Sequence, residues 1–230
     1  MNQDAVAVRA ALQRERATAL AEKVAEWLAP LAGDEHVLDV GCGTGAFAFA
    51  IAGAVASVVG IDGDVASLDA ARAAAPPNVE LRHGDATALA FADASFDIAG
   101  CFRVLHHVTT PDRVVAELGR VTRHGGRLLL VDQLREPDPD AAAATERFER
   151  ARDVSHARLL ARAEIETTLR EAGFEIHRTD LVRERRETER FLDLAGLTSE
   201  RREAVRALAP ADAYDVEVGW FLACRHRDTP

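Results

Sequence analysis

Short apolar runs alternate with helical patterns along residues 36–132, and this alternation limits the possible folds more than any other feature. Strands that alternate with helices form parallel sheets, because right-handed crossovers return each strand in the same direction. The strand-like runs are 36–40, 57–61, 79–82, 95–101 and 127–132. The last, RLLLVD, is nearly all apolar, as expected for a strand covered on both faces. The chain therefore predicts an α/β fold.

Helical patterns fill the intervals between these runs, at 46–54 and 65–75. Thr110, Pro111 and Asp112 form a cap-like start for another helix, which we expect to end at the glycine pair 125–126. An amphipathic helix over 5–29 precedes the first strand, with apolar residues spaced near 3.6. These helices are expected to pack on the sheet.

The alternation pauses after Asp132, where EPDPD leads into a helix with no strand before it. We predict its apolar stripe at Ala141, Ala144, Phe148 and Ala151. A further helix ends at Gly173, followed by a strand over 174–182, two short polar helices within 184–209 and a last strand over 216–226. The prediction is one domain over 1–230, with an N-terminal helical segment at 1–30 and substrate-cap insertions at 135–162 and 183–214.

Composition narrows the choice of partner and compartment. The net charge of −10 disfavours nucleic acid, because phosphate binding needs a concentrated basic face. The arginine clusters 183–190 and 201–206 are interleaved with glutamates, which predicts solvated helix faces. No apolar run approaches the 18 or so residues of a membrane span, and no signal pattern opens the chain. We expect a cytoplasmic protein with a small-molecule substrate, in an oligomeric state that the sequence leaves open.

Three cysteines, Cys42, Cys101 and Cys224, lack CxxC spacing, which predicts neither a disulfide framework nor a structural zinc site. The eight histidines show no HxxxH or HxH pairing with carboxylates. The sequence therefore predicts no metal site.

The stretch VLDVGCGTG, residues 37–45, joins the first predicted strand to the following helix. Glycines let the backbone turn tightly there and approach a ligand closely, which implies a nucleotide-like ligand. With Ala46 the stretch also satisfies the dinucleotide fingerprint GxGxxA, and Asp62 lies about 20 residues on, as that fingerprint requires. The loop alone therefore fits either S-adenosylmethionine (SAM) or a dinucleotide.

Three aspartates at successive strand ends favour SAM. Asp39 lies where the pyrophosphate of a dinucleotide would rest on the helix N-terminus, and two anions would repel. SAM instead presents an ammonium and a sulfonium, which a carboxylate stabilises. Asp62 suits either ligand, because a carboxylate there can accept both ribose hydroxyls, and Asp85 can accept the adenine amino group. Each aspartate alone is more often a cap or turn residue, but three at the ligand-binding edge of an α/β sheet reverse those odds.

The motifs VLDVGCGTG, VVGID, HGDATALAF with SFDI, CFRVLHHV and LGRVTRHGGRLLLVD resemble those of class I SAM-dependent methyltransferases. They are more closely similar to the ubiquinone/menaquinone-biosynthesis C-methyltransferase type, with its Methyltransferase 11-like domain. The resemblance covers about residues 33–182. It implies a Rossmann-like sheet, mostly parallel with an antiparallel last strand, helices on both faces and helical cap insertions. It also implies methyl transfer from SAM to a small molecule.

The resemblance carries over to particular residues of the cofactor site. It implies methionine binding at Asp39, Gly41, Cys42 and Gly43, ribose binding at Asp62 beside Gly63, adenine binding at Asp85 and Ala86, and a pocket edge at Cys101 and Phe102. The chain departs from the quinone-modifying enzymes in lacking their usual aromatic N-terminal segment.

Histidines are the candidate catalytic residues. Methyl transfer from a sulfonium mainly requires alignment and exclusion of water, and a base is needed only if the acceptor must lose a proton. His106 and His107 follow the fourth strand near the expected methyl position, and His156, the preferred candidate, lies in the predicted cap. The alternatives are that His107 shapes its loop and that His156 fixes the cap. Arg103 and Arg158 are candidates for binding a substrate anion.

Three functions thus remain at the level of sequence: a SAM-dependent methyltransferase, an NAD(P)-dependent oxidoreductase, and a SAM-binding module without catalytic activity. Asp39 and Asp85 favour the first over the second. The acceptor atom, whether carbon, oxygen or nitrogen, is not evident from these motifs.

Overall fold

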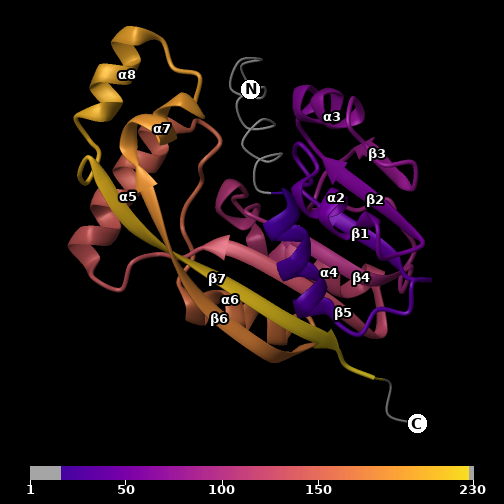
Figure 1. Ribbon diagram of the computed structural model, residues 1–230. Coiled ribbons are helices and arrows are strands. Elements are labelled where there is room, and N and C mark those ends of the chain that lie inside the picture. Colours follow the sequence, from indigo (N-terminus) through magenta and orange to yellow (C-terminus); the bar gives the residue numbers. More distant parts are fainter. Residues whose placement is uncertain (1–16, 228–230) are drawn as a thin grey trace.

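The computed structural model describes residues 17–227 (Figure 1). Within that range seven strands form one sheet in the order β3-β2-β1-β4-β5-β7-β6. The strands are β1 (His36–Val40), β2 (Ser57–Asp62), β3 (Val79–His83), β4 (Phe96–Phe102), β5 (Thr122–Gln133), β6 (Phe174–Glu187) and β7 (Ala213–Arg225). The first five pair in parallel, whereas β7 pairs antiparallel with both β5 and β6. The predicted Rossmann-like sheet with an antiparallel last strand is confirmed.

The helices connect and cover these strands. They are α2 (Ala46–Ala52), α3 (Val65–Arg72), the 3-10 helix η1 (Leu105–His107), α4 (Pro111–Val121), α5 (Pro139–Arg152), α6 (Arg162–Glu171), α7 (Thr188–Asp193) and α8 (Ser199–Arg206). Residues 17–28 are also helical, in agreement with the helix predicted over 5–29. The rest of that prediction, 5–16, lies outside the described residues.

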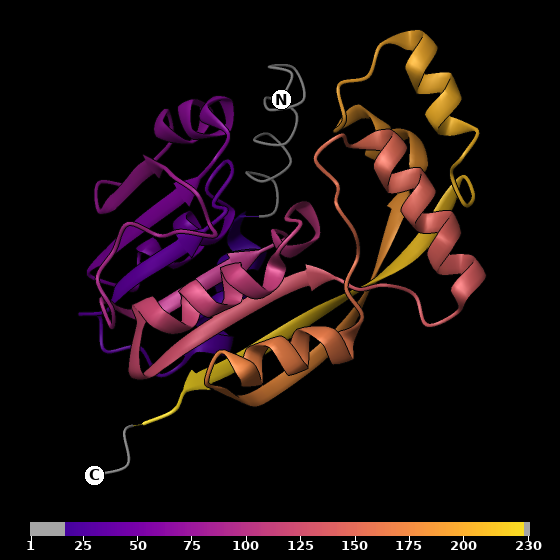
Figure 2. The same ribbon diagram turned by 180° about the vertical axis from the view of Figure 1, so that it is seen from behind.

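Both faces of the sheet are covered, as the apolar β5 run requires. Helices α4 and α6 lie on one face (Figure 2), where their side chains pack with Leu128 and Leu130 of β5. Helix α2 and residues 17–28 cover the other face and pack with Leu129 and Val131. Successive β5 residues therefore enter opposite cores, which is why RLLLVD lacks the alternation of a half-exposed strand.

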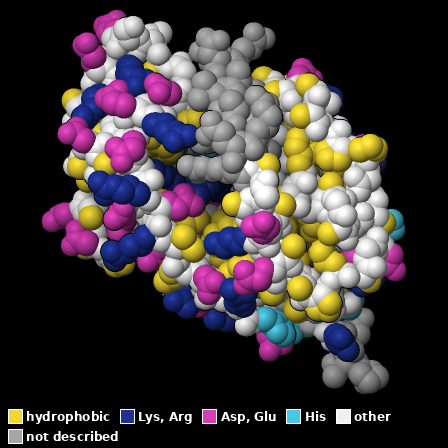
Figure 3. Space-filling view, viewed as in Figure 1, with side chains coloured by type: hydrophobic (Ala, Val, Ile, Leu, Met, Phe, Trp, Pro, Cys, Tyr) yellow, Lys and Arg dark blue, Asp and Glu magenta, His cyan; other side chains and the backbone are white. Residues whose placement is uncertain are grey.

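Helices α5, α7 and α8 lie beyond the sheet, next to the far ends of β6 and β7 (Figure 1). The two strands stay paired as far as Glu187 and Ala213, so β6 extends five residues past the predicted end at Val182. The charged run RERRE therefore forms a strand and not a helix. Acidic and basic side chains are interspersed over this cap region in Figure 3.

Two further local predictions were wrong. Helix α4 ends at Val121, and the glycine pair 125–126 lies inside β5, where residues 123–126 bulge between two ladder pairs with β4. In α5 only Phe148 of the predicted stripe is buried, and the other buried side chains are Ala142, Thr145, Glu149 and Arg152. The buried face of α5 is polar because its ions pair inside the cap.

The close packing of α4 on the end of α6 predicts a stability effect. A Cβ atom on Gly119 would lie 2.5 Å from the backbone oxygen of Ala172, whereas a Cβ on Gly53 would have no neighbour within 4 Å. We expect Gly119→Ala to lower the free energy of unfolding by about 1 to 3 kcal/mol, because the helices must separate. Gly53→Ala should be neutral or stabilising by up to about 1 kcal/mol. Urea denaturation of both variants measures this, and equal effects would contradict it.

Candidate functional site

The glycine loop between β1 and α2 is held in a conformation that favours glycine. Gly41, Gly43 and Gly45 have φ angles of 69°, 51° and 89°. A Cβ on Gly41 would lie 2.3 Å from Cγ2 of Val104, whereas Gly43 has no atom within 4 Å of that position. The Gly41 and Cys42 amides donate to the carbonyl of Ile61 at 2.7 and 3.0 Å. The loop is therefore fixed on its β2 side and open at Gly43.

Asp39 lies beneath this loop and is 1% exposed. Its Oδ2 accepts from the amide of Ala48, in the first turn of α2, at 3.0 Å, and Oδ1 has no hydrogen-bond partner among the described residues. Burial raises the pKa of Asp39 to about 7, and the negative charge of Asp62 adds to this effect. An unpartnered buried carboxylate oxygen at the loop is suited to a nearby cation.

Asp62 and Asp85 lie at the neighbouring strand ends. Asp62, half-buried, accepts from the Gly43 amide at 2.7 Å and the Asp64 amide at 2.8 Å, so it joins the end of β2 to the open part of the loop. Asp85 is exposed, and both of its hydrogen bonds, from the amide and the hydroxyl of Thr87, go to Oδ1. These bonds lower the pKa of Asp85, and Oδ2 remains available to a ligand.

Four of the other predicted cofactor residues are buried or partly buried. Burial raises the pKa of the Cys42 and Cys101 thiols well above the usual range, so neither is a nucleophile. Cys101 is 1% exposed and belongs to the core under α4. Phe102 stacks on Phe47 with ring centroids 4.7 Å apart. Ala86 is partly buried beside Asp85.

The loop fits an adenosyl amino acid better than a dinucleotide. In a dinucleotide site the amides at the N-terminus of the helix bind a pyrophosphate. Here the Ala48 amide already binds the carboxylate of Asp39, which would repel that anion. A ribose next to Asp62 and a cationic amino acid next to Asp39 meet carboxylates instead. The residues present therefore fit SAM.

The three predicted catalytic histidines lie together. The ring centroid of His106 is 4.1 Å from that of His107 and 5.7 Å from that of His156. Buried Asp132, at the end of β5, accepts from Nδ1 of His106 and from the Leu105 and Gln133 amides. Burial alone would raise the pKa of Asp132, but its attraction to His106 and these hydrogen bonds lower it. One carboxylate thus fixes the shape of η1.

His156 is almost completely enclosed, with a side chain 1% exposed and Nε2 3.1 Å from Oε2 of Glu146. Burial lowers the pKa of His156 despite this contact. Glu146 also accepts from the Leu159 amide, and the His106 carbonyl accepts from the Ala157 amide at 2.8 Å. His156 therefore lies where the cap segment meets η1.

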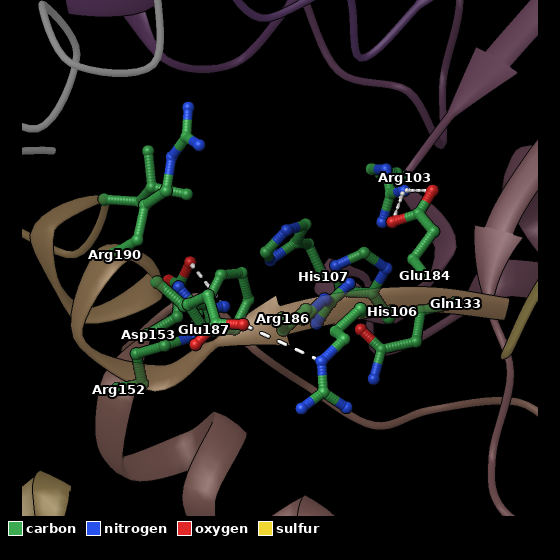
Figure 4. Close-up of a pocket in the computed structure, with 13 residues that line it drawn as sticks. Arg103, His106, His107, Gln133, Arg152, Asp153, Glu184, Arg186, Glu187 and Arg190 are labelled. Carbon is green, nitrogen blue, oxygen red and sulfur yellow. Dashed lines mark hydrogen bonds and ion pairs between the residues drawn. The ribbon is translucent and has the colours of Figure 1, made fainter. Parts of the chain in front are cut away.

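A cavity of about 620 Å³ lies between η1 and the cap (Figure 4). His106 and His107 lie between the Arg103–Glu184 pair on one side and residues of α5 and α7 on the other. The cavity is lined by Arg103, His106, His107, Gln133, Arg152, Asp153, Glu184, Arg185, Arg186, Glu187, Arg190, Phe191 and Leu194. His156 and Arg158 are not among these lining residues, and Arg158 pairs with Glu164 at 2.9 Å.

Several lining residues were missed from the sequence. Gln133 is 4% exposed, and its Nε2 has no hydrogen-bond partner among the described residues. Arg186 was assigned to a solvated helix face but is a buried strand residue, 3.2 Å from Glu149. Arg152 and Arg186 both lie over the ring of Phe191. A polar residue directly after RLLLVD was a signal for Gln133, whereas burial of Arg186 depends on the cap.

Comparison with known proteins bears on this site. Residues 38–130 match the family model described as a methyltransferase domain. Residues 38–130 therefore form a methyltransferase domain. The crystal structure of a presumed methyltransferase from Bacillus halodurans is similar to the chain, with a TM-score of 0.81, 28% identity and coverage of 90% of this chain and 98% of that one.

Two curated relatives show the same similarity in sequence. The uncharacterized methyltransferase YcgJ of Bacillus subtilis is 35% identical over 129 residues, which is 54% of this chain and 51% of YcgJ. The 27-O-demethylrifamycin SV methyltransferase of Amycolatopsis mediterranei is 36% identical over 171 residues, or 70% of this chain and 61% of that enzyme. The alignments thus span between half and two thirds of these relatives.

Two further observations concern membrane-spanning helices and metal-binding groups among the described residues. Among residues 17–227 no helix has the length and apolar character needed to cross a membrane. In the same part of the chain, no group of three or more His, Cys, Asp or Glu side chains is arranged to hold a metal ion.

The raised pKa of Asp39 predicts a pH dependence of stability in the ligand-free protein. Between about pH 4 and pH 7 the folded state holds more protons at Asp39 than the unfolded chain, so stability falls as the pH rises. This contributes a slope of up to about 1.4 kcal/mol per pH unit. Asp39→Asn should remove that slope, measured by urea unfolding from pH 5 to 8. Asp69→Asn, on the exposed side of α3, is the control. Parallel profiles for wild type and Asp39→Asn would disprove the assignment.

Proposed function

We propose that the chain is a SAM-dependent methyltransferase that acts on a small molecule bound in the cavity between η1 and the cap. One observation carries this proposal: the carboxylates of Asp39, Asp62 and Asp85 lie at the ends of three adjacent parallel strands, at the edge of the sheet from which η1 leads to the cavity. The methyltransferase domain at 38–130 and the names of its relatives support it.

In this proposal the glycine loop holds the methionine part of SAM through Asp39, Gly41, Cys42 and Gly43. Asp62 and Gly63 hold the ribose, Asp85 and Ala86 hold the adenine, and Cys101 and Phe102 form the pocket edge. Bound SAM supplies an electrophilic methyl group next to a leaving sulfur. The chain itself has to orient the acceptor, exclude water and receive any proton that is released.

His106 and His107 line the cavity and are proposed as the catalytic histidines. His156, the third candidate, is proposed as a positioning residue, because its ring is enclosed and hydrogen-bonded to Glu146. In that role it keeps the cap segment against η1. Its side chain would then contribute to acceptor binding without touching the acceptor.

We propose a single domain over 1–230, in which 1–30 is an N-terminal segment and 135–162 and 183–214 form the cap. Helices α5, α7 and α8 beside the cavity support the role of the two insertions. The acidic net charge and interspersed surface charges support a partner other than nucleic acid. The three free thiols support a reducing cytoplasmic location.

The resemblance to quinone C-methyltransferases is carried by the cofactor motifs and says little about the acceptor. The proposed acceptor cavity is lined by five arginines and three acidic residues. Such a wall favours a polar acceptor over the apolar tail of a ubiquinone or menaquinone precursor, because buried charges have to stay hydrogen-bonded. We therefore propose a polar small molecule as the substrate.

Binding experiments separate the three functions that the sequence allowed. A methyltransferase binds SAM and S-adenosylhomocysteine and converts one into the other when an acceptor is present. A SAM-binding module binds both but transfers no methyl group to any of a broad panel of phenols, amines and carbon acids. An oxidoreductase binds NADH, seen as quenching of its fluorescence, and not SAM.

The role of Asp62 predicts a selective loss of cofactor affinity. We expect Asp62→Asn to weaken SAM binding by roughly 10- to 100-fold, because each hydrogen bond to a charged group contributes about 1.5 to 3 kcal/mol. Isothermal titration calorimetry measures this, and thermal unfolding checks that the variant folds. Asp69→Asn, which removes an exposed aspartate of α3, should bind SAM like the wild type. Equal affinity of wild type and Asp62→Asn would reject the proposed ribose site.

A further inference from the structure

The side chains of His107, Ser155 and Asp153 form a hydrogen-bonded chain at the cavity. The Ser155 hydroxyl donates to Oδ1 of Asp153 at 2.6 Å, and its oxygen lies 3.0 Å from Nδ1 of His107. His107 and Asp153 line the cavity, on opposite sides of the boundary between η1 and the cap (Figure 4). These three hydrogen-bonded side chains therefore connect the two parts of the proposed acceptor site.

The directions of the hydrogen bonds among Asp153, Ser155 and His107 determine which nitrogen of His107 carries a proton. Burial would raise the pKa of Asp153, but the bonds from Ser155 and the charge of Arg152 hold it below the usual range. The carboxylate is therefore ionised and only accepts. Since the single hydroxyl proton of Ser155 is directed to Asp153, Nδ1 of His107 has to be the donor to Ser155. Nε2 then carries the lone pair.

His107 is neutral at physiological pH, as a base has to be. Burial lowers the pKa of His107 to about 4, and neighbouring His106 adds to this effect, while Asp153 and Asp132 oppose it. His106 is enclosed more fully than His107 and is held by Asp132. Of the two lining histidines, His107 is thus the one that the cap orients.

Gln133 adds an independent constraint on the acceptor. Its amide nitrogen is buried at the cavity without a partner among the described residues, so a ligand atom that accepts a hydrogen bond would satisfy it. A hydroxyl oxygen has two lone pairs, one to attack a methyl group and one to accept from Gln133. A neutral amine has only one lone pair, which the methyl transfer uses, and the reacting carbon of a carbon acid is not a comparable acceptor. Neither could therefore accept from Gln133 at the reacting atom during the transfer.

We infer that the acceptor is a hydroxyl compound, with Gln133 as donor to its oxygen and His107, positioned by Ser155 and Asp153, as the base that takes its proton. This rests on the proposed function. The new bond joins the hydroxyl oxygen to the methyl carbon as the bond between that carbon and sulfur breaks. The electron pair of the broken bond stays on sulfur. The hydroxyl proton passes to Nε2 of His107, which then releases it to water.

The positions of the ring protons can be tested without substrate. In ¹⁵N-labelled protein at pH 7, long-range proton–nitrogen NMR spectra distinguish the histidine tautomers, and the signals absent from His107→Gln identify His107. We expect neutral His107 with its proton on Nδ1. Ser155→Ala should move it toward Nε2, and Ser155→Thr, which keeps the hydroxyl, should not. A proton on Nε2 in the wild type, or no change in Ser155→Ala, would overturn the proposed positioning of His107 by Ser155 and Asp153.

A transfer assay tests the acceptor class. It measures the S-adenosylhomocysteine released from SAM in the presence of each member of a panel of phenols and of the matched anilines. We expect phenols to be methylated and anilines not. Ser155→Ala and Gln133→Met should each lower kcat about 10-fold or more with the KM for SAM within about 3-fold of wild type, and Ser155→Thr should restore kcat. Preference for anilines, or unchanged kcat in both variants, would overturn the proposal. SAM binding without any transfer would instead reject the proposed function and leave the NMR result standing.

Discussion

The parallel run of strands β1 to β5 is the constraint on which the rest of the molecule depends. Parallel strands end at the same edge of a sheet, so residues far apart in sequence meet there. Asp39 and Asp62 lie at the carboxyl ends of β1 and β2, and Asp85 follows β3. The helix η1 follows β4, and Asp132 is the last residue but one of β5. Covering both faces with helices leaves this edge as the place where polar groups converge. The candidate site is thus a consequence of topology.

Asp132 connects the sheet to the proposed acceptor cavity. Its carboxylate holds the η1 backbone and the ring of His106, and the carbonyl of His106 accepts from amides of the cap segment. Cap, loop and sheet are therefore joined through a few buried hydrogen bonds. Because unpaired buried groups are costly, these hydrogen bonds stabilise the contact between the three parts.

Local sequence patterns predicted the sheet well and brought three aspartates to one edge of it, because both follow from short-range rules. Strand periodicity, glycine at left-handed φ and a polar residue after each buried strand are visible within a few positions. The end of β6 and the buried face of α5 were predicted wrongly for the opposite reason. Whether RERRE forms a helix or a strand depends on its pairing with β7, which lies far along the chain.

The sequence by itself determined the α/β fold, the glycine loop with its three aspartates, and the candidate histidines. Only the tertiary structure decided which histidines face the cavity, since that depends on the path of the cap over η1. It also brought Ser155 to His107 and left Gln133 without a partner. Neither contact has a local signature, because each joins segments folded on different parts of the sheet. The proposed cofactor residues thus belong to local motifs, whereas the residues that line the proposed acceptor cavity were brought together by packing.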